Sequence, residues 1–362
     1  MNRRDVKEPA LVSLPDRVRD RDVFHDKDGR VFVTLGYIQP TNRILSFFKY
    51  APHPDGKWVS GEQRYERIFW GGGASASEGM AKAPDDYLVY DEHFGVELLE
   101  VPRDDVGKYF SPEIRLKEII DDGAKDPLEK SVGEMAETLH DTLGIPLERL
   151  GVTGSIAWKA HDPSFSDINM NIYGLQASWQ LQNCYDEVAE KNPHMRLREL
   201  HEWERTMSRV VARIPVLPVE DMKTLFTRRK GLLCNERSIG VMPILLPDET
   251  PIIHGSESYT TVTVSPVRVE MEVTSERYGL FLPAIYEGLS DPLDVIEGGQ
   301  VSRIMVYEGS FRGLIREGDR VEVSGIIQRV APTGNRGELS YQMMVGSKVG
   351  AGKEFIRLVS KA

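Results

Sequence analysis

The sequence predicts an α+β fold, in which a central α/β domain lies between a small β-rich amino-terminal unit and a carboxy-terminal β-barrel. Three patterns carry this prediction. Residues before about position 111 alternate as strands, the middle of the chain has the order helix, strand, turn, strand, and the last hundred residues again alternate as strands. We expect the three regions to span residues 1–111, 112–247 and 248–362, because a chain of 362 residues is long enough for two or three domains.

The amino-terminal unit is expected to begin with two strands, Arg30–Tyr37 and Arg43–Tyr50, joined by a turn-rich connection. Aromatic side chains on such strands usually form a core, but here Arg43 and Lys49 are interleaved with them. A stacking platform for single-stranded nucleic acid is therefore the alternative. The glycine-rich run Gly71–Gly79 carries no helix signal and is expected to be a surface loop. The aromatic residues of the two expected strands are Tyr37, Phe47, Phe48 and Tyr50.

A helix is expected at the start of the central region. Asp126 is a suitable N-cap, proline follows at the first helical position, and Glu129 stands three residues after the cap. Apolar residues then recur at helical spacing up to Leu143, and Gly144 ends the helix. Residues 150–153 follow as a buried strand.

A Gly-Ser pair at Gly154 and Ser155, followed by a polar strand from Asp167, is the most informative pattern in the chain. Along residues 167–172 acidic or amide side chains alternate with apolar ones, so that Asp167 and Asn169 share one face of the strand. A glycine lets the backbone approach phosphate oxygens, and free N–H groups at a helix start attract anions. The pattern therefore indicates a site for a metal–phosphate group.

This arrangement resembles the nucleotidyltransferase superfamily that includes DNA polymerase beta. In that family a Gly-Ser turn is followed by Asp-x-Asp on a strand and by a third carboxylate on a later strand. The resemblance implies that Gly154 and Ser155 hold the triphosphate of ATP or another nucleoside triphosphate, and that Asp167 and Asn169 bind Mg²⁺. The order of the three regions is similar to that of predicted archaeal nucleotidyltransferases with extra amino- and carboxy-terminal domains.

The chain departs from the family pattern in its acids. Two-metal phosphoryl transfer requires carboxylates that bridge two cations about 3.5–4 Å apart, and the amide of Asn169 carries no charge. The strand expected to supply the third ligand, residues 238–246, contains no acid. Two functions therefore remain open. One is metal-dependent transfer of a nucleoside monophosphate to an acceptor hydroxyl, and the other is nucleotide or nucleic-acid binding by a catalytically degenerate domain.

Substitute ligands exist, each with a structural interpretation that we favour. Asp162 precedes a proline and is expected to bond its own turn. Glu270 and Glu272 lie on the polar face of an alternating strand, which is typical of a solvated surface. His161, in the spacer before Asp167, is expected to be a solvated loop residue.

The densest basic cluster of the central region comprises Arg228, Arg229 and Lys230. These side chains could bind the phosphates of a nucleotide or of a single strand of RNA or DNA. The alternative is that they lie at a helix carboxy-terminus, where the helix dipole favours cations.

The carboxy-terminal region contains an alternating strand, Gly318–Val330, with a glycine at its middle. The string Gly-Asp-Arg-Val-Glu-Val-Ser-Gly resembles a strand of OB-fold barrels, in which glycine allows the strand to coil. The resemblance implies an OB-like barrel that binds a single strand, docks a partner or is purely structural.

Composition indicates a cytoplasmic globular protein. The chain has no apolar run long enough to cross a membrane, and its first residues do not form a secretory signal. Its two cysteines, Cys184 and Cys234, lack metal-ligand spacing and are expected to be reduced. A net charge of −11 argues against a generally basic surface that coats nucleic acid. Any contact with nucleic acid would have to be local.

Overall fold

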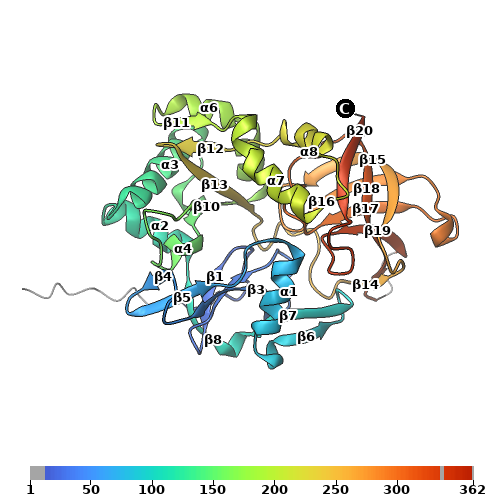
Figure 1. The fold of residues 1–362 in the computed structure, drawn as a ribbon, viewed down its shortest axis with the longest axis horizontal. Coiled ribbons are helices and arrows are strands. Elements are labelled where there is room, and N and C mark those ends of the chain that lie inside the picture. The colour runs from blue at the N-terminus through green and yellow to red at the C-terminus, as the bar shows by residue number, and fades with distance from the viewer. Residues whose placement is uncertain (1–12, 335–337, 361–362) are drawn as a thin grey trace, which may run out of the picture.

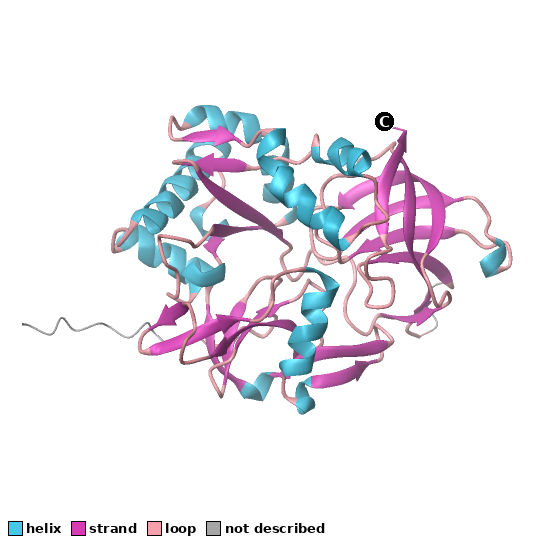
Figure 2. Cartoon of the chain, in the orientation of Figure 1, coloured by secondary structure: helices cyan, strands magenta, loops and turns pink. Residues whose placement is uncertain are grey.

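The computed structural model describes residues 13–334 and 338–360 and shows a mixed α/β protein built on three sheets. Figure 1 shows the three parts of the chain arranged around the middle of the molecule, with the amino-terminal unit below, the central sheet and its helices at upper left, and the carboxy-terminal strands at right. Figure 2 shows that most helices gather on the central sheet, while the other two parts consist mainly of strands. The expected mixed fold class is confirmed.

The amino-terminal unit is a sheet organised by one long strand, β3, which pairs with β2, β5 and β7. The aromatic side chains of the two expected strands are all buried in it, so the proposed stacking platform is wrong and the core interpretation is right. Its strands are β1 (Val23–Asp26), β2 (Val31–Thr34), β3 (Arg43–Pro52), β4 (Trp58–Ser60), β5 (Gln63–Arg67), β6 (Leu88–Asp91), β7 (Val96–Pro102) and β8 (Val106–Phe110).

The glycine-rich segment is a helix, α1 (Gly72–Lys82), and the expected loop is wrong. Gly71 and Gly72 both have positive φ angles, 112° and 79°, which turn the chain from the sheet into the helix. The hydroxyl of Ser75 accepts a hydrogen bond of 2.7 Å from the backbone N–H of Trp70. The helix therefore forms in spite of its glycines and serines, because the turn before it and the packing against β3 hold it.

The central sheet has the order β11-β12-β13-β10-β9, with β10 parallel to β13 and antiparallel to β9. Helix α3 begins at the predicted cap, Asp126, whose carboxylate accepts hydrogen bonds from two backbone N–H groups, and it ends at Gly144 with a φ of 64°. The strands are β9 (Leu150–Val152), β10 (Ile168–Tyr173), β11 (Met195–Leu197), β12 (Leu232–Cys234) and β13 (Arg237–Ile244). The helices are α2 (Pro112–Asp121), α3 (Pro127–Leu143), α4 (Gly154–Ala157), α5 (Leu175–Asn183), α6 (Tyr185–Lys191), α7 (Glu204–Arg213) and α8 (Val219–Phe226).

Five strands of the carboxy-terminal part pair in a closed ring, in the order β15, β16, β17, β19, β18 and back to β15. Strand β17 is parallel to β19, and the other pairs of the ring are antiparallel. Gly325 stands where β18 changes partner from β15 to β19, and a Cβ there would lie 2.4 Å from the carbonyl oxygen of Met344. The strands are β14 (Glu257–Thr261), β15 (Val267–Tyr278), β16 (Ala284–Ser290), β17 (Val301–Val306), β18 (Arg320–Pro332), β19 (Ser340–Val345) and β20 (Phe355–Ser360).

The buried clusters cross the expected domain boundaries. Helices α7 and α8 contribute Met207, Val210, Leu225 and Phe226 to the same core as the interior of the barrel. A second shared cluster joins the amino-terminal unit to the barrel, where the backbone N–H of Tyr37 donates to the carbonyl of Leu282 at 2.9 Å. The three parts are therefore packed together. None of the helices in the described ranges is long and apolar enough to cross a membrane.

Candidate functional site

The Gly-Ser turn lies between β9 and β10 and is fixed from both sides. Gly154 has a φ of 65°, a conformation that glycine adopts without steric penalty. The backbone N–H of Thr153 donates to the carbonyl of Asn169 at 3.0 Å, and the Thr153 hydroxyl donates to the carbonyl of Arg21, also at 3.0 Å. The turn therefore connects the central sheet to the amino-terminal unit.

The side chain of Ser155 does not lie in open space. It is buried, and its hydroxyl is 3.5 Å from that of Ser166 in the spacer before β10. The Ser166 hydroxyl in turn accepts a hydrogen bond from the backbone N–H of Asp162. Ser155 thus supports the spacer, and a phosphate could reach it only after the spacer moved.

Asn169 lies against the glycine of the turn, as the sequence pattern predicts. A Cβ built on Gly154 would be 3.5 Å from the amide nitrogen of Asn169. On the other side, Gly240 of β13 stands opposite Asn169 in the parallel pairing, and a Cβ there would be 3.0 Å from the amide oxygen. The neighbouring strand, which we expected to carry the third carboxylate in this family, therefore presents a glycine at that position.

Asp167 is exposed at the start of the same strand. Its charge acts on two neighbours, Arg198 after β11 and Tyr50 of β3. Burial lowers the pKa of Arg198, against the opposing effect of Glu202 and Asp167. The only acid of the predicted pair therefore faces an arginine.

These residues do not fit a two-metal centre. The polar side chains at the start of β10 are one carboxylate, Asp167, and one neutral amide, Asn169. On β13, Gly240 stands where a third ligand would be expected. Two divalent cations bridged by a single carboxylate would retain most of their repulsion.

The predicted basic cluster separates into three different environments. The guanidinium of Arg228 donates to the buried carboxylate of Asp319 at 2.5 and 2.9 Å, so it is not free to bind phosphate. Lys230 forms a surface ion pair with Asp186 at 3.0 Å. Arg229 remains, and it borders a small pocket of about 130 Å³ together with Arg198 and Trp203.

Arg229 is half-buried and has no carboxylate partner among the described residues. One of its terminal nitrogens donates to the carbonyl of Ser310 at 2.7 Å, and its Nε is buried without a partner in the described structure. Burial and the nearby charge of Arg312 lower its pKa to about 10. Among the described residues, this cation therefore meets a neutral carbonyl and the rings of Phe226 and Trp203, but no carboxylate.

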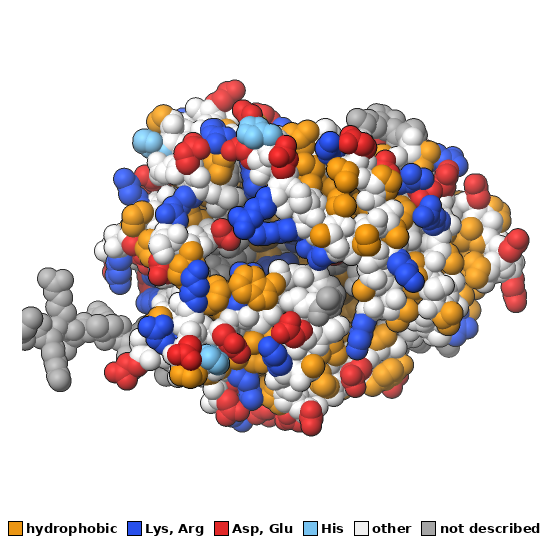
Figure 3. All heavy atoms as spheres, viewed as in Figure 1, with side chains coloured by type: hydrophobic (Ala, Val, Ile, Leu, Met, Phe, Trp, Pro, Cys, Tyr) orange, Lys and Arg blue, Asp and Glu red, His pale blue; other side chains and the backbone are white. Residues whose placement is uncertain are grey.

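Four further cations lie close by, and the sequence analysis did not connect them to the site. Arg21 precedes β1, Lys49 and Arg67 belong to β3 and β5, and Arg312 follows β17. The charge of Arg21 lowers the pKa of both Arg312 and Lys49, so the set extends from the barrel to the amino-terminal unit. Figure 3 shows a hollow near the middle of the face, where the three parts meet, with Lys and Arg side chains gathered at its edge. We call this hollow the central cleft.

An exposed aromatic side chain stands beside these cations. Trp70, between β5 and α1, is 64% exposed, and the guanidinium of Arg67 lies 4.5 Å from the centre of its ring. Trp70 contacts Trp58, which contacts Phe165 in the spacer just before Asp167. The indole is therefore connected through two aromatic contacts to the predicted site.

Asp126, Glu129 and His161 form the one cluster of potential metal ligands in the described ranges, with ligand atoms within 4.8 Å of one another. Each oxygen already has a partner. Asp126 caps α3 and accepts from His161 at 2.7 Å, while Glu129 pairs with Arg115 and accepts from the backbone N–H of Lys125. The charge of Arg115 would repel a metal cation. The cluster instead fastens the spacer to the start of α3, and the expectation that His161 is solvated is wrong.

The remaining acids have the structural roles that we favoured. The carboxylate of Asp162 accepts hydrogen bonds from the N–H and the hydroxyl of Ser164 within its own turn. Glu270 and Glu272 are exposed on β15. Neither set reaches the central cleft through any contact of the described residues.

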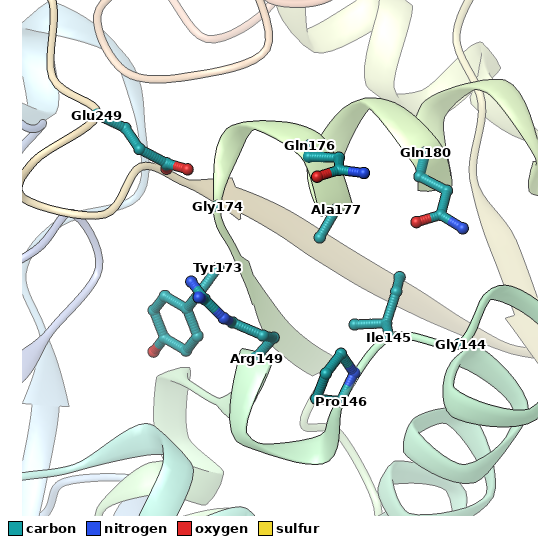
Figure 4. A pocket seen from close by; sticks show the side chains of 10 residues that line it. All are labelled: Gly144, Ile145, Pro146, Arg149, Tyr173, Gly174, Gln176, Ala177, Gln180 and Glu249. Atoms are coloured by element: carbon teal, nitrogen blue, oxygen red, sulfur yellow. The ribbon is translucent and has the colours of Figure 1, made fainter.

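A pocket of about 260 Å³ lies at the opposite end of β10 from Asp167 (Figure 4). Arg149, Gln176, Gln180 and Glu249 surround it, and Glu249 accepts a hydrogen bond of 3.0 Å from the first N–H of α5. A carboxylate of the protein thus already occupies the position where an anion would bind this helix.

One relative is similar to this chain over almost its whole length. An uncharacterized protein of Methanocaldococcus jannaschii, MJ1086, is 23% identical over 357 residues, which cover 94% of this chain and 99% of the relative. No family model matches the chain. No solved structure matches it significantly.

Proposed function

We propose that this protein binds a nucleotide in the central cleft, on a domain of nucleotidyltransferase type. The observation that carries the proposal is the close approach of Asn169 to the backbone of Gly154, where an added Cβ would be 3.5 Å from the amide nitrogen, on a strand that directly follows the exposed Asp167. A bare backbone, an amide and a carboxylate side by side can bind the phosphate and sugar groups of a nucleotide. The adjacent arginines supply positive charge for its phosphates.

Trp70 is proposed to stack on the nucleobase. It is the exposed aromatic side chain beside Arg67, and base–aromatic stacking contributes about 1–3 kcal/mol in proteins. Stacking tolerates all bases, because every base has a π-face, so we expect little base preference from Trp70 alone.

We further propose that the carboxy-terminal ring is an OB-type barrel. Its pairing order and the glycine at the partner change of β18 support this assignment. Such barrels bind single-stranded RNA or DNA in many proteins, which makes a strand a candidate partner of this region. The two free cysteines accord with a cytoplasmic location.

Nucleotidyl transfer to an acceptor hydroxyl is the second candidate function. The juxtaposition of Gly154, Asn169 and Asp167 favours it, while Gly240 opposite Asn169 favours binding without turnover. Binding is therefore our conclusion.

Titration of ATP and GTP, followed by tryptophan fluorescence and calorimetry, tests this proposal. Trp70→Ala should weaken binding about tenfold or more, since it removes the stacking energy. Trp179→Phe is the control, because that indole bonds the carbonyl of Arg277 away from the cleft and should leave affinity unchanged. Failure of both nucleotides to bind, or equal affinity for inorganic tripolyphosphate, would overturn the proposal.

A further inference from the structure

Six cations from all three parts of the chain form one set, in which the charge of each acts on at least one other member. They are Arg21, Lys49 and Arg67 of the amino-terminal unit, Arg198 and Arg229 of the central part, and Arg312 of the barrel. All six side chains are half-buried. Such a gathering of positive charge destabilises a folded chain unless something else compensates it.

The protein itself supplies little compensation. Arg67 and Arg198 donate to the carbonyl oxygens of Phe69 and Glu202. Arg312 donates to the sulfur of Met242 at 3.3 Å. These acceptors are neutral. Buried nitrogens of Arg21, Arg229 and Arg312 have no hydrogen-bond partner at all in the described part of the chain.

Three carboxylates lie within reach of the set, and they do not balance it. Asp20 is 3.5 Å from Arg21 and also acts on Arg312, but it forms no hydrogen bond with either in the described structure. Asp167 and Glu202 act on Arg198. The ammonium of Lys49 lies about 5 Å from the rings of Phe47 and Phe69, and no ion pair forms with it among the described residues. An excess of about three positive charges therefore remains when all six cations are protonated.

The backbone of Arg21 shows that its position is imposed. Its φ is 68°, a conformation that non-glycine residues rarely adopt. Its N–H donates to Thr34 and its carbonyl accepts from the Thr153 hydroxyl, so that both neighbouring parts hold it in place. Backbone strain of this kind is concentrated at functional sites.

Met242 locates the cations relative to the predicted site. It stands two residues after Gly240 on β13, hence on the same face of the sheet as Asn169. The contact of Arg312 with Met242 therefore brings a guanidinium of the barrel onto the face that carries the polar row.

We propose that these six side chains bind a polyphosphate chain directly, without a bridging metal ion. Guanidinium groups match phosphate oxygens in bidentate geometry and need no metal to neutralise them. The ligand is a linear di- or triphosphate, free or carried by a nucleoside, because the cations surround a cleft and do not form an extended track. The inference rests on the proposed function for the location of the ligand, but it does not require the nucleoside.

Calorimetry of the full chain with sodium tripolyphosphate in excess EDTA at low salt tests the inference. We expect binding in EDTA and weaker binding when Mg²⁺ is added, because the metal ion neutralises the ligand before it meets the arginines. Binding that requires Mg²⁺, or no binding in EDTA, would overturn the inference. If ATP binds only in the presence of Mg²⁺, the inference is wrong but the proposed function stands. If tripolyphosphate binds as tightly as ATP, the inference stands but the proposal that the protein binds a nucleotide is wrong.

Arg312→Met and Arg229→Met identify the residues responsible. Each should weaken tripolyphosphate binding about tenfold or more, as expected for the loss of a charge-assisted contact. The melting temperature should stay the same or rise, because an uncompensated cation is removed. Arg228→Met is the matched control, because Arg228 is adjacent to Arg229 in the sequence but pairs with Asp319, so affinity should persist while stability falls. Unchanged affinity for tripolyphosphate in both test variants would refute the site. Displacement of bound tripolyphosphate by a 5′-hydroxyl oligonucleotide at a concentration below that of tripolyphosphate itself would refute it as well.

Discussion

Arg228 and Asp319 form a two-point ion pair that joins the end of α8 to the start of β18. Two nitrogens of the guanidinium donate to the two carboxylate oxygens, and Asp319 is fully buried. The same carboxylate accepts the backbone N–H of Arg316 at 2.7 Å. Arg228 was expected to meet phosphates, and instead it fixes the helical segment to the barrel.

Replacing Arg228 by Met should lower the free energy of unfolding by about 3 kcal/mol, since it leaves a buried carboxylate unpaired. Urea unfolding followed by circular dichroism measures the effect. Arg320→Met, which removes an exposed arginine paired with Glu270, is the control and should change stability by less than about 0.5 kcal/mol. Equal unfolding midpoints for the two variants would show that the buried pair does not hold the barrel.

Lys49→Met should stabilise the protein by about 1 kcal/mol or more, because a buried ammonium is replaced by an apolar chain of similar length. Burial, together with the charges of Arg67 and Arg21, holds the pKa of Lys49 well below its usual range. Between the folded pKa and the unfolded value near about 10.4, the unfolded chain binds a proton that the folded chain does not. Stability of the natural protein should thus rise with pH across this interval.

Unfolding experiments at several pH values test the Lys49 prediction, because the Met variant should lack this rise. A parallel pH dependence in the two proteins would mean that Lys49 is fully protonated in the folded state throughout. The Lys49→Met variant should also bind tripolyphosphate more weakly. This result would distinguish a lysine that binds the ligand from a lysine that only destabilises the folded protein.

Asp126→Ala should destabilise the protein by about 1–2 kcal/mol, because α3 loses its N-cap and the spacer loses the bond to His161. Asp126→Asn keeps a capping oxygen and should lose less. Burial would raise the pKa of Asp126, but the hydrogen bonds from His161 and from the helix outweigh it and lower that pKa. The contribution of Asp126 is therefore complete above the unfolded pKa near about 3.9 and is lost as pH falls through the folded value. Acid titration of stability should show a smaller loss in the Asn variant, and identical acid profiles would contradict this assignment.

Restoring the missing acids tests how complete the transferase site is. The double variant Asn169→Asp, Gly240→Asp places carboxylates at the two facing positions of β10 and β13. Calorimetry should detect Mg²⁺ binding that the natural protein lacks without nucleotide, because the added charges supply ligands that a hard cation prefers. Release of pyrophosphate from ATP by this variant, but not by the natural protein, would identify a degenerate transferase. Tight Mg²⁺ binding by the natural protein would instead show that ligands have been overlooked.

The predictable parts of the structure depend on neighbours in the sequence. Backbone preferences predict the helix start at Asp126 and the helix end at Gly144. Side-chain alternation predicts the strand that begins after Asp167, and the structure contains all three features. The approach of Asn169 to Gly154 is also local, because the two residues belong to consecutive elements, and the strands β9 and β10 pair with each other. By contrast, we expected a loop where the helix Gly72–Lys82 forms, because its glycines and serines favour a loop and the packing against β3 overrides them.

Only the tertiary structure decided which charges meet. Arg228 and Arg229 are adjacent in the sequence and chemically identical, yet one pairs with Asp319 and the other lacks a carboxylate partner among the described residues. Arg21 and Arg312 lie at opposite ends of the chain and come together because the amino-terminal unit packs against the barrel. Charge interactions depend on distance in space and on burial, and neither quantity is fixed by the order of residues along the chain.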